Sequence, residues 1–324
     1  MPSLAHHGFK SHAATEFAIG FAIGITVVTS LAGAAIAGLL SNNRPRSQSY
    51  LYLALSIAAM IAGAVLLIWD GNRHDPPPNA SAGVTPPALK LPDPSLPGPH
   101  KVRTLTYGSG TDKYRPEFAA GIAIKTHAVD GSPFVENWKG RAGWARSRFW
   151  GFDSTKLPLQ GRVWYPDGPG PFPLALFVHG NHPMEDFSDP GYAYLGELMA
   201  SRGIIFVSVD QNFLNYSTSD LLGFPNAGLR DENDARAWMR LEHIRLWSAW
   251  NKEAGNPFWG HVDTQRIALL GHSRGGEAAA IAAVFNRLPN YPDDARIKLG
   301  YNYAIRGIAA IAPTDGKYKP AVST

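Results

Sequence analysis

The stretch IALLGHSRGGEAAAIAA, residues 267–283, joins an apolar segment, a glycine-rich turn and an alanine-rich segment in direct succession. Apolar residues in a row before a glycine are typical of a buried strand, and a run of alanine favours a helix. The sequence therefore predicts a strand, a sharp turn and a helix, with Ser273 inside the turn. Such a serine is either a nucleophile held at a strained turn or part of an ordinary strand-to-helix connection.

The alternation of short apolar segments and longer helical segments continues on both sides of this turn. Strands that are apolar throughout and joined by helices are typical of a parallel sheet covered on both faces. Segments of more alternating polarity nearer the start indicate antiparallel strands. We therefore predict an α/β fold with a mostly parallel sheet flanked by helices. The expected strands are 102–108, 118–129, 161–166, 173–180, 204–210, 266–272 and 305–313, and the expected helices are 191–203, 229–255 and 275–288.

Two long apolar segments precede this domain. Residues 17–40 and 50–69 contain no charged side chain, and each is long enough as a helix to cross a hydrocarbon core of about 30 Å. A cleaved signal peptide is the alternative for the first segment, but its length and the second segment favour a transmembrane hairpin. We expect this hairpin in residues 1–74, an extended proline-rich linker in residues 75–100 and the α/β domain in residues 101–324.

The charges beside the two apolar segments indicate an orientation. The connector between them carries Arg44 and Arg46, against Lys10 before the first segment and Arg73 after the second. Because basic residues prefer cytoplasmic loops, we expect the connector in the cytoplasm and the α/β domain outside it. The expected location is the bacterial inner membrane, as a multi-pass protein in contact with the lipid bilayer.

Composition and spacing argue against several classes of chemistry. The chain contains no cysteine, which excludes disulfides, thiolate metal sites and cysteine nucleophiles. Its formal charge of +4 comes from bases scattered among acids, which argues against a nucleic-acid partner. His179 and His182 are potential metal ligands, but the segment is not helical and no acidic ligand stands at a clear spacing. We expect neither a metal nor a cofactor.

A nucleophilic serine needs small neighbours and donors for the oxyanion. Gly271 and Gly275 stand two residues before and after Ser273, where a sharp turn presses side chains against adjacent backbone. The backbone N–H of Arg274, at the start of the helix, is one expected oxyanion donor. The second is expected from the loop after the strand 173–180, from the backbone N–H of Asn181 or, one residue on, of His182.

Three segments together resemble the α/β-hydrolase superfamily, in the order expected for it: LALFVHGN (174–181), YLGELMASRGIIFVSVDQNFLN (194–215) and GHSRGGEA (271–278). The second segment is similar to the bacterial branch of dienelactone hydrolases, platelet-activating-factor acetylhydrolases and cutinase-like polyester hydrolases. The resemblance implies a serine esterase in which Ser273 attacks an ester carbonyl and forms an acyl-enzyme. Asn181 and Arg274 would form the oxyanion hole.

The chain departs from that pattern after its sixth expected strand. The resemblance implies a triad acid and then a histidine downstream of the serine, but no histidine follows His272. Asp315 follows the strand 305–313 and is the candidate for the triad acid. The alternative is that Asp315 is a loop residue without a special role. We therefore expect a hydrolase that is truncated at its C-terminus, with impaired activity because the base is absent.

The sequence thus predicts a membrane-anchored serine hydrolase acting on a small-molecule or lipid-like ester, without a cofactor. Two alternatives stay open. One is a non-catalytic membrane protein that retains a hydrolase-like scaffold for binding, and the other is an acyltransferase. The acyl group, the alcohol and the oligomeric state are not predicted.

Overall fold

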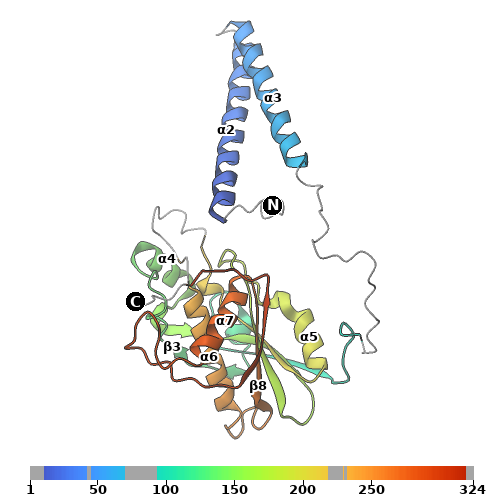
Figure 1. Cartoon of the computed structure of the whole chain (residues 1–324), viewed down its shortest axis with the longest axis vertical. Helices are drawn as coiled ribbons and strands as arrows, with labels where there is room; N and C mark the ends of the chain where they lie inside the picture. The colour runs from blue at the N-terminus through green and yellow to red at the C-terminus, as the bar shows by residue number, and fades with distance from the viewer. Residues whose placement is uncertain (1–10, 42–44, 70–92, 218–228, 230–231, 319–324) are drawn as a thin grey trace. The chain divides into compact units, whose positions relative to one another are not determined.

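The computed structural model describes residues 11–41, 45–69, 93–217, 229 and 232–318, with the side chains of 11–23 and 64–69 left out (Figure 1). The chain divides into two units, Met1–Leu89 and Lys90–Thr324. The first unit contains two helices that contact each other, α2 (Ser11–Ser41) and α3 (Arg46–Trp69). The second unit contains the sheet and the remaining helices.

The described part of the first unit contains one segment that is long and apolar enough to cross a membrane, by length and composition. This segment is Gly24–Ser41 of α2, with a mean hydropathy of 1.8. It lies in the first predicted span. The second predicted span, 50–69, lies in α3, and its side chains from residue 64 onward are outside the described residues. The two-span hairpin therefore remains a prediction.

Most of the predicted proline-rich linker lies outside the described residues, but its end packs on the second unit. Gly98 N donates to Ser201 Oγ at 2.8 Å, and His100 N donates to the backbone oxygen of Ser201 at 2.9 Å. The Arg202 guanidinium also donates to the backbone oxygen of Leu96. Residues 96–100 therefore belong to the sheet-containing unit rather than to a free spacer.

The second unit is built on one seven-stranded sheet in the order β2-β1-β5-β7-β6-β8-β9. Pairs β1–β2, β6–β7, β6–β8 and β8–β9 are parallel, and β1–β5 and β5–β7 are antiparallel. The predicted α/β class with a mostly parallel sheet is confirmed. The strands are β1 (Val102–Gly108), β2 (Ile124–Lys125), β5 (Gly161–Pro166), β6 (Phe172–Val178), β7 (Ile205–Val209), β8 (Val262–His272) and β9 (Ile305–Ile311); β3 (Ala128–Val129) and β4 (Leu157–Pro158) pair separately.

Helices cover both faces of this sheet (Figure 1). Each face of the sheet has its own hydrophobic core, and successive side chains of β6 point into the two cores in turn. Leu174 and Leu176 pack in the larger core, and Phe177 packs in the smaller. The smaller core lies under α5, and the larger contains residues of α6 and α7. The helices of this unit are α4 (Gly140–Trp150), α5 (Ala193–Ser201), α6 (Asn233–Trp250) and α7 (Arg274–Phe285), with short 3₁₀ turns at Pro116–Phe118, Ser154–Lys156, Asp189–Tyr192 and Asn212–Leu214.

The structure corrects two of the predicted elements and adds a helix that was not predicted. The strand expected at 118–129 is divided between β2 and β3, which belong to different sheets, because Thr126 between them bonds to β1 through its backbone N–H and to Leu159 through its hydroxyl. Helix α4 was not predicted. The helix expected over 229–255 spans Asn233–Trp250 and is buried nearly all round.

Strand β9 differs from the other parallel strands of the sheet. Its residues after Ile305 are exposed, whereas every residue of β7 is buried. Ile308 and Ile311 are each nearly half exposed, and β8 is its one partner strand among the described residues. An apolar edge strand of this kind is open to pairing with further polypeptide.

Candidate active site

Ser273 lies at the junction of β8 and α7, as predicted from the local sequence. Its backbone angles are φ 54° and ψ −122°, outside the regions that L-residues ordinarily occupy. It occupies the N-cap position of α7, yet its side chain makes no capping hydrogen bond. A serine that served as an ordinary helix cap would have extended backbone angles and a capping hydroxyl. The geometry is therefore that of a strained turn rather than of a common helix start.

The two glycines flanking the serine are required by close backbone contacts. A Cβ at Gly271 would collide with the backbone oxygen of Gly275. A Cβ at Gly275 would collide with the backbone oxygen of Val178 and lie 2.6 Å from that of His179. The turn is thus pressed both on itself and on the end of β6, which is the steric reason for small residues at these two positions.

The end of β9 completes the support of the turn. Ser273 N donates to the Ile311 oxygen at 3.0 Å, and Thr314 N donates to the Ser273 oxygen at 3.2 Å. Ala312, between these two partners, has φ 41°. Ser273 and Ala312 are the two non-glycine residues with positive φ among those the structure describes. Backbone strain of about 1–3 kcal/mol per residue persists only where surrounding contacts enforce it, and such strain clusters at functional sites.

The predicted oxyanion loop passes directly beside Ser273. A Cβ at Gly180 would lie 3.0 Å from the Ser273 Cβ, a tight contact that the glycine avoids. In the described part of the chain, the backbone N–H groups of Asn181, His182 and Arg274 have no hydrogen-bond partner. Unpaired donors at a helix N-terminus and in an adjacent loop can stabilise a negative oxygen placed between them.

His179 and His182 hold the shape of this loop. The His179 ring is buried; Nδ1 donates to the Gly180 oxygen at 2.8 Å, and Nε2 accepts from Gln211 N at 3.2 Å. His182 bonds to Ser188 Oγ at 2.7 Å and to the Pro183 oxygen at 2.9 Å. Burial lowers the pKa of both imidazoles, that of His179 to about 3. Among the described residues no group of histidines and carboxylates is arranged to hold a metal ion.

The neutral state of His179 makes stability dependent on pH. Its pKa in the folded protein lies below the ordinary value of 6.5, so the unfolded chain binds a proton first as the pH falls. Its contribution is present above pH 6.5 and declines below it. Between pH 7 and pH 5, the stability advantage of the wild type over His179→Asn should fall by about 2 kcal/mol in urea unfolding. An advantage that stays constant over this range would contradict a neutral buried His179.

Asp315, the residue proposed from the sequence for the acid, makes no hydrogen bond to the serine, and no residue was proposed for the base. Asp315 is exposed and makes no hydrogen bond or ion pair among the described residues. Within the same part of the chain, the hydroxyl of Ser273 has no hydrogen-bond partner, and His272 is exposed. Within the described residues, the geometry brings together Ser273, the two glycines and the oxyanion loop, and no acid or base is hydrogen-bonded to the serine.

Two residues that sequence reasoning did not place at the site contact the turn. The Glu277 carboxylate accepts hydrogen bonds from Asn233 Nδ2 at 2.9 Å and from Lys317 N at 2.7 Å, which fastens the segment after β9 to α7. The Arg240 guanidinium, from α6, donates to backbone oxygens on both sides of Ser273. Neither contact has a local sequence pattern, because the partners are far apart in the chain.

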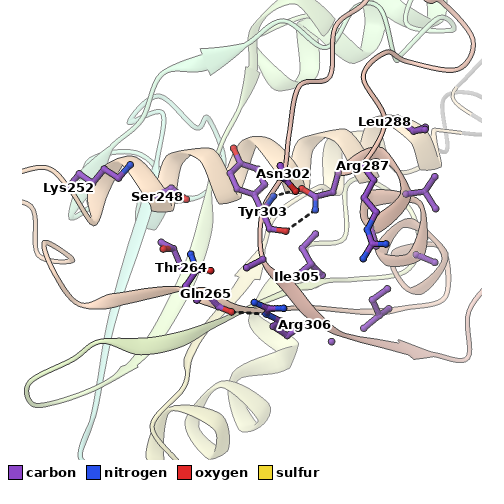
Figure 2. Close-up of a pocket in the computed structure, with 17 residues that line it drawn as sticks. Ser248, Lys252, Thr264, Gln265, Arg287, Leu288, Asn302, Tyr303, Ile305 and Arg306 are labelled. Carbon is purple, nitrogen blue, oxygen red and sulfur yellow. Dashed lines mark hydrogen bonds between the residues drawn. The ribbon is translucent and has the colours of Figure 1, made fainter.

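A large cavity lies elsewhere in the same unit. It has a volume of about 1170 Å³ and contains none of the residues predicted for the site. Figure 2 shows Arg306 on its wall, where the guanidinium donates to the Gln265 oxygen at 3.1 Å. Lys252, Arg287 and Arg306 line it without an acidic residue. The cavity adjoins the first half of β9, whereas Ser273 follows the last residue of β8.

The described unit is thus an α/β domain with a strained serine where one central strand of its sheet meets a helix. Neither a model of a known protein family nor a curated protein sequence matches the chain. We therefore infer the roles of the residues at this turn from their geometry and chemistry.

Proposed function

We propose that the chain is a serine hydrolase of the α/β-hydrolase type and that Ser273 is its nucleophile toward carboxylic esters. The observation that carries the proposal is the strained backbone of Ser273, with φ 54° and no capping bond, beside a glycine of the loop after β6. The strand order supports it as well, because β8 ends at the serine and β6, its parallel neighbour, leads into the loop with unpaired donors.

In the proposed reaction, Ser273 Oγ attacks the ester carbonyl and the carbonyl oxygen becomes negative. The backbone N–H groups of Asn181 and Arg274 would donate to that oxygen. The bond to the alcohol then breaks, the alcohol leaves with a proton, and water releases the acid from the serine. Because the Ser273 hydroxyl has no base among the described residues, water has to take its proton, which makes acylation slow.

Because the Ser273 hydroxyl has no hydrogen-bond partner within the described residues, we keep one second candidate, a scaffold that binds ligands without turnover. In either case we propose that α2 anchors the chain in a membrane, on the basis of the apolar segment Gly24–Ser41. The multi-pass arrangement and the extracytoplasmic position of the α/β domain are part of this proposal.

Labelling with a fluorophosphonate tests the nucleophile, because attack by a serine oxygen on phosphorus displaces fluoride. We expect the full chain, solubilised in mild detergent, to label at Ser273. The rate should be lower by a factor on the order of 10⁴ than that of a serine paired with a histidine. Peptide mass spectrometry identifies the site. Ser273→Ala should abolish the label, whereas Ser109→Ala, on a distant loop, should retain it.

A result in which wild type and Ser273→Ala label equally would contradict the proposed nucleophile and favour the scaffold. The position of the α/β domain is tested separately by protease digestion of intact cells. Protection of that domain would contradict an extracytoplasmic position.

A further inference from the structure

We propose that Arg240 is a positioning residue that holds the Ser273 turn in its strained conformation. Its effect on the backbone of the turn does not depend on whether Ser273 is a nucleophile. Its effect on reactivity rests on the function proposed for Ser273. The argument starts from the hydrogen bonds of this side chain.

Arg240 belongs to α6, the helix that packs beside α7, and its side chain extends to the turn. Its side chain is fully buried. Nη1 donates to the Leu270 oxygen at 3.1 Å, and Nη2 donates to the Gly275 oxygen at 2.5 Å. Leu270 lies three residues before Ser273, on β8, and Gly275 lies two residues after it, in the first turn of α7. One guanidinium therefore bridges the end of the strand and the start of the helix, and the strained residue lies between the two bonded carbonyls.

The space for this bridge is provided by Gly271. A Cβ at that position would lie 2.8 Å from Arg240 Nη2, in addition to its collision with the Gly275 oxygen. The backbone of the turn requires the glycine, and the same lack of a side chain leaves room for the guanidinium that binds there. This second role has no counterpart in the local spacing of glycine and serine.

Burying the charged Arg240 side chain only to fill space would be energetically unfavourable. No carboxylate pairs with its guanidinium in the described part of the chain, and burial, together with the nearby Arg236 cation, lowers its pKa to about 9. A buried cation without a counter-charge is unfavourable unless its donors are well used. Here Nη1 and Nη2 bind the two carbonyls that flank the turn, whereas Nε has no hydrogen-bond partner among the described residues. A planar fork of this kind can bind two separate carbonyls at once, which the single ammonium of lysine cannot do equally well.

The consequence for Ser273 follows from where the bridge ends. The Ser273 oxygen accepts from Gly276 N at 2.9 Å and from Glu277 N at 3.2 Å. If the bridge is removed, the start of α7 is free to separate from the end of β8, and the serine can relax toward ordinary backbone angles. The Ser273 Cβ would then no longer lie beside Gly180 and the loop after β6.

Hydrogen exchange of the turn amides in the full chain tests the bridge. In Arg240→Met, the amides of Gly276 and Glu277 should exchange at least about tenfold faster than in the wild type, because two hydrogen bonds from a charged donor are lost. Arg240→Lys should give an intermediate increase. The matched control is Tyr301→Phe, which removes a buried hydrogen bond to Glu242, also on α6 but away from the turn. It should leave exchange in 271–278 unchanged.

Fluorophosphonate labelling adds the chemical readout. In Arg240→Lys, the maximal labelling rate of Ser273 should fall by about tenfold or more while the half-saturating probe concentration stays constant, since the reacting serine and not the probe site is displaced. Tyr301→Phe should label at the wild-type rate. If the wild type does not label, the proposed function fails, but the exchange experiment still decides the bridge. Equal acceleration of turn exchange in Tyr301→Phe, or unchanged exchange in both Arg240 variants, would overturn the positioning role.

Discussion

Gly275→Ala is expected to destabilise the sheet-containing unit by about 3 kcal/mol or more, although it adds a single methyl group. The added Cβ would collide with the Val178 oxygen and lie 2.6 Å from the His179 oxygen. Both are backbone atoms at the end of a central strand, so neither can rotate away as a flexible side chain could. Relief requires α7 or the end of β6 to move, and either movement separates Ser273 from the oxyanion loop.

Urea unfolding of the full chain in detergent, followed by tryptophan fluorescence, measures this effect. The matched control is Gly307→Ala on β9, where a Cβ would meet no atom within 4 Å. This change should alter stability by less than about 0.5 kcal/mol. If Gly275→Ala were equally neutral, β6 and α7 could not be packed as closely as described, and the turn would lose the steric basis of its strain.

The order of elements around Gly275 was predictable because the sequence there is locally consistent. Apolar strands ending in glycine or aspartate and an alanine-rich helix each have one favoured conformation, so β6, β7, β8 and α7 were found near their true bounds. Helix α4 was missed for the opposite reason. Its residues Gly143 and Arg146 are a poor match to an apolar helical stripe, and buried Arg146 bonds to the backbone oxygens of Phe213 and Asn215, which are distant in sequence.

Helix α6 shows a second limit of local patterns. Its arginines and its histidine indicate a solvent-facing side, but Arg236, Arg240 and His243 are fully buried. Each has a partner that is remote in sequence: the Asn215 side chain, two backbone oxygens at the turn, and the Tyr107 hydroxyl. Polar residues can lie inside a protein when such partners exist, and a single sequence does not contain that information.

In the candidate site, too, some features follow from local sequence and others depend on packing between distant segments. Ser273, its two glycines and the loop carrying Asn181 follow from spacing within short segments. The hydrogen bonds of Arg240 and Glu277 depend on how α6, α7 and β9 pack, so no local sequence pattern predicts them. Asp315 shows the converse, since its place after β9 suggested an acid, while its side chain is exposed and makes no hydrogen bond to the serine.

Arg115→Met is expected to destabilise the protein by about 3–5 kcal/mol at neutral pH, because it leaves buried carboxylates without their cation. The Arg115 guanidinium is 3% exposed and pairs with Asp112 and Asp210, each at 2.7 Å, and with Asp189 at 3.3 Å. Although burial opposes its charge, these carboxylates hold the pKa of Arg115 above its ordinary value. The network joins the segment after β1 to the end of β7, so its loss loosens one side of the sheet.

The loss should be smaller at pH 5 than at pH 7, since carboxylates that lack a cation in a buried place take up protons more readily. Even with Arg115 present, burial and then Asp210 raise the pKa of Asp189 to about 6. Arg296→Met is the matched control: it removes an ion pair of 2.7 Å with Asp294, but the arginine is 91% exposed. Exposed pairs contribute about 0–1 kcal/mol, so urea unfolding should barely change. Equal effects of the two variants would mean that the Arg115 carboxylates reach water in solution, and the network would then not hold β1 to β7.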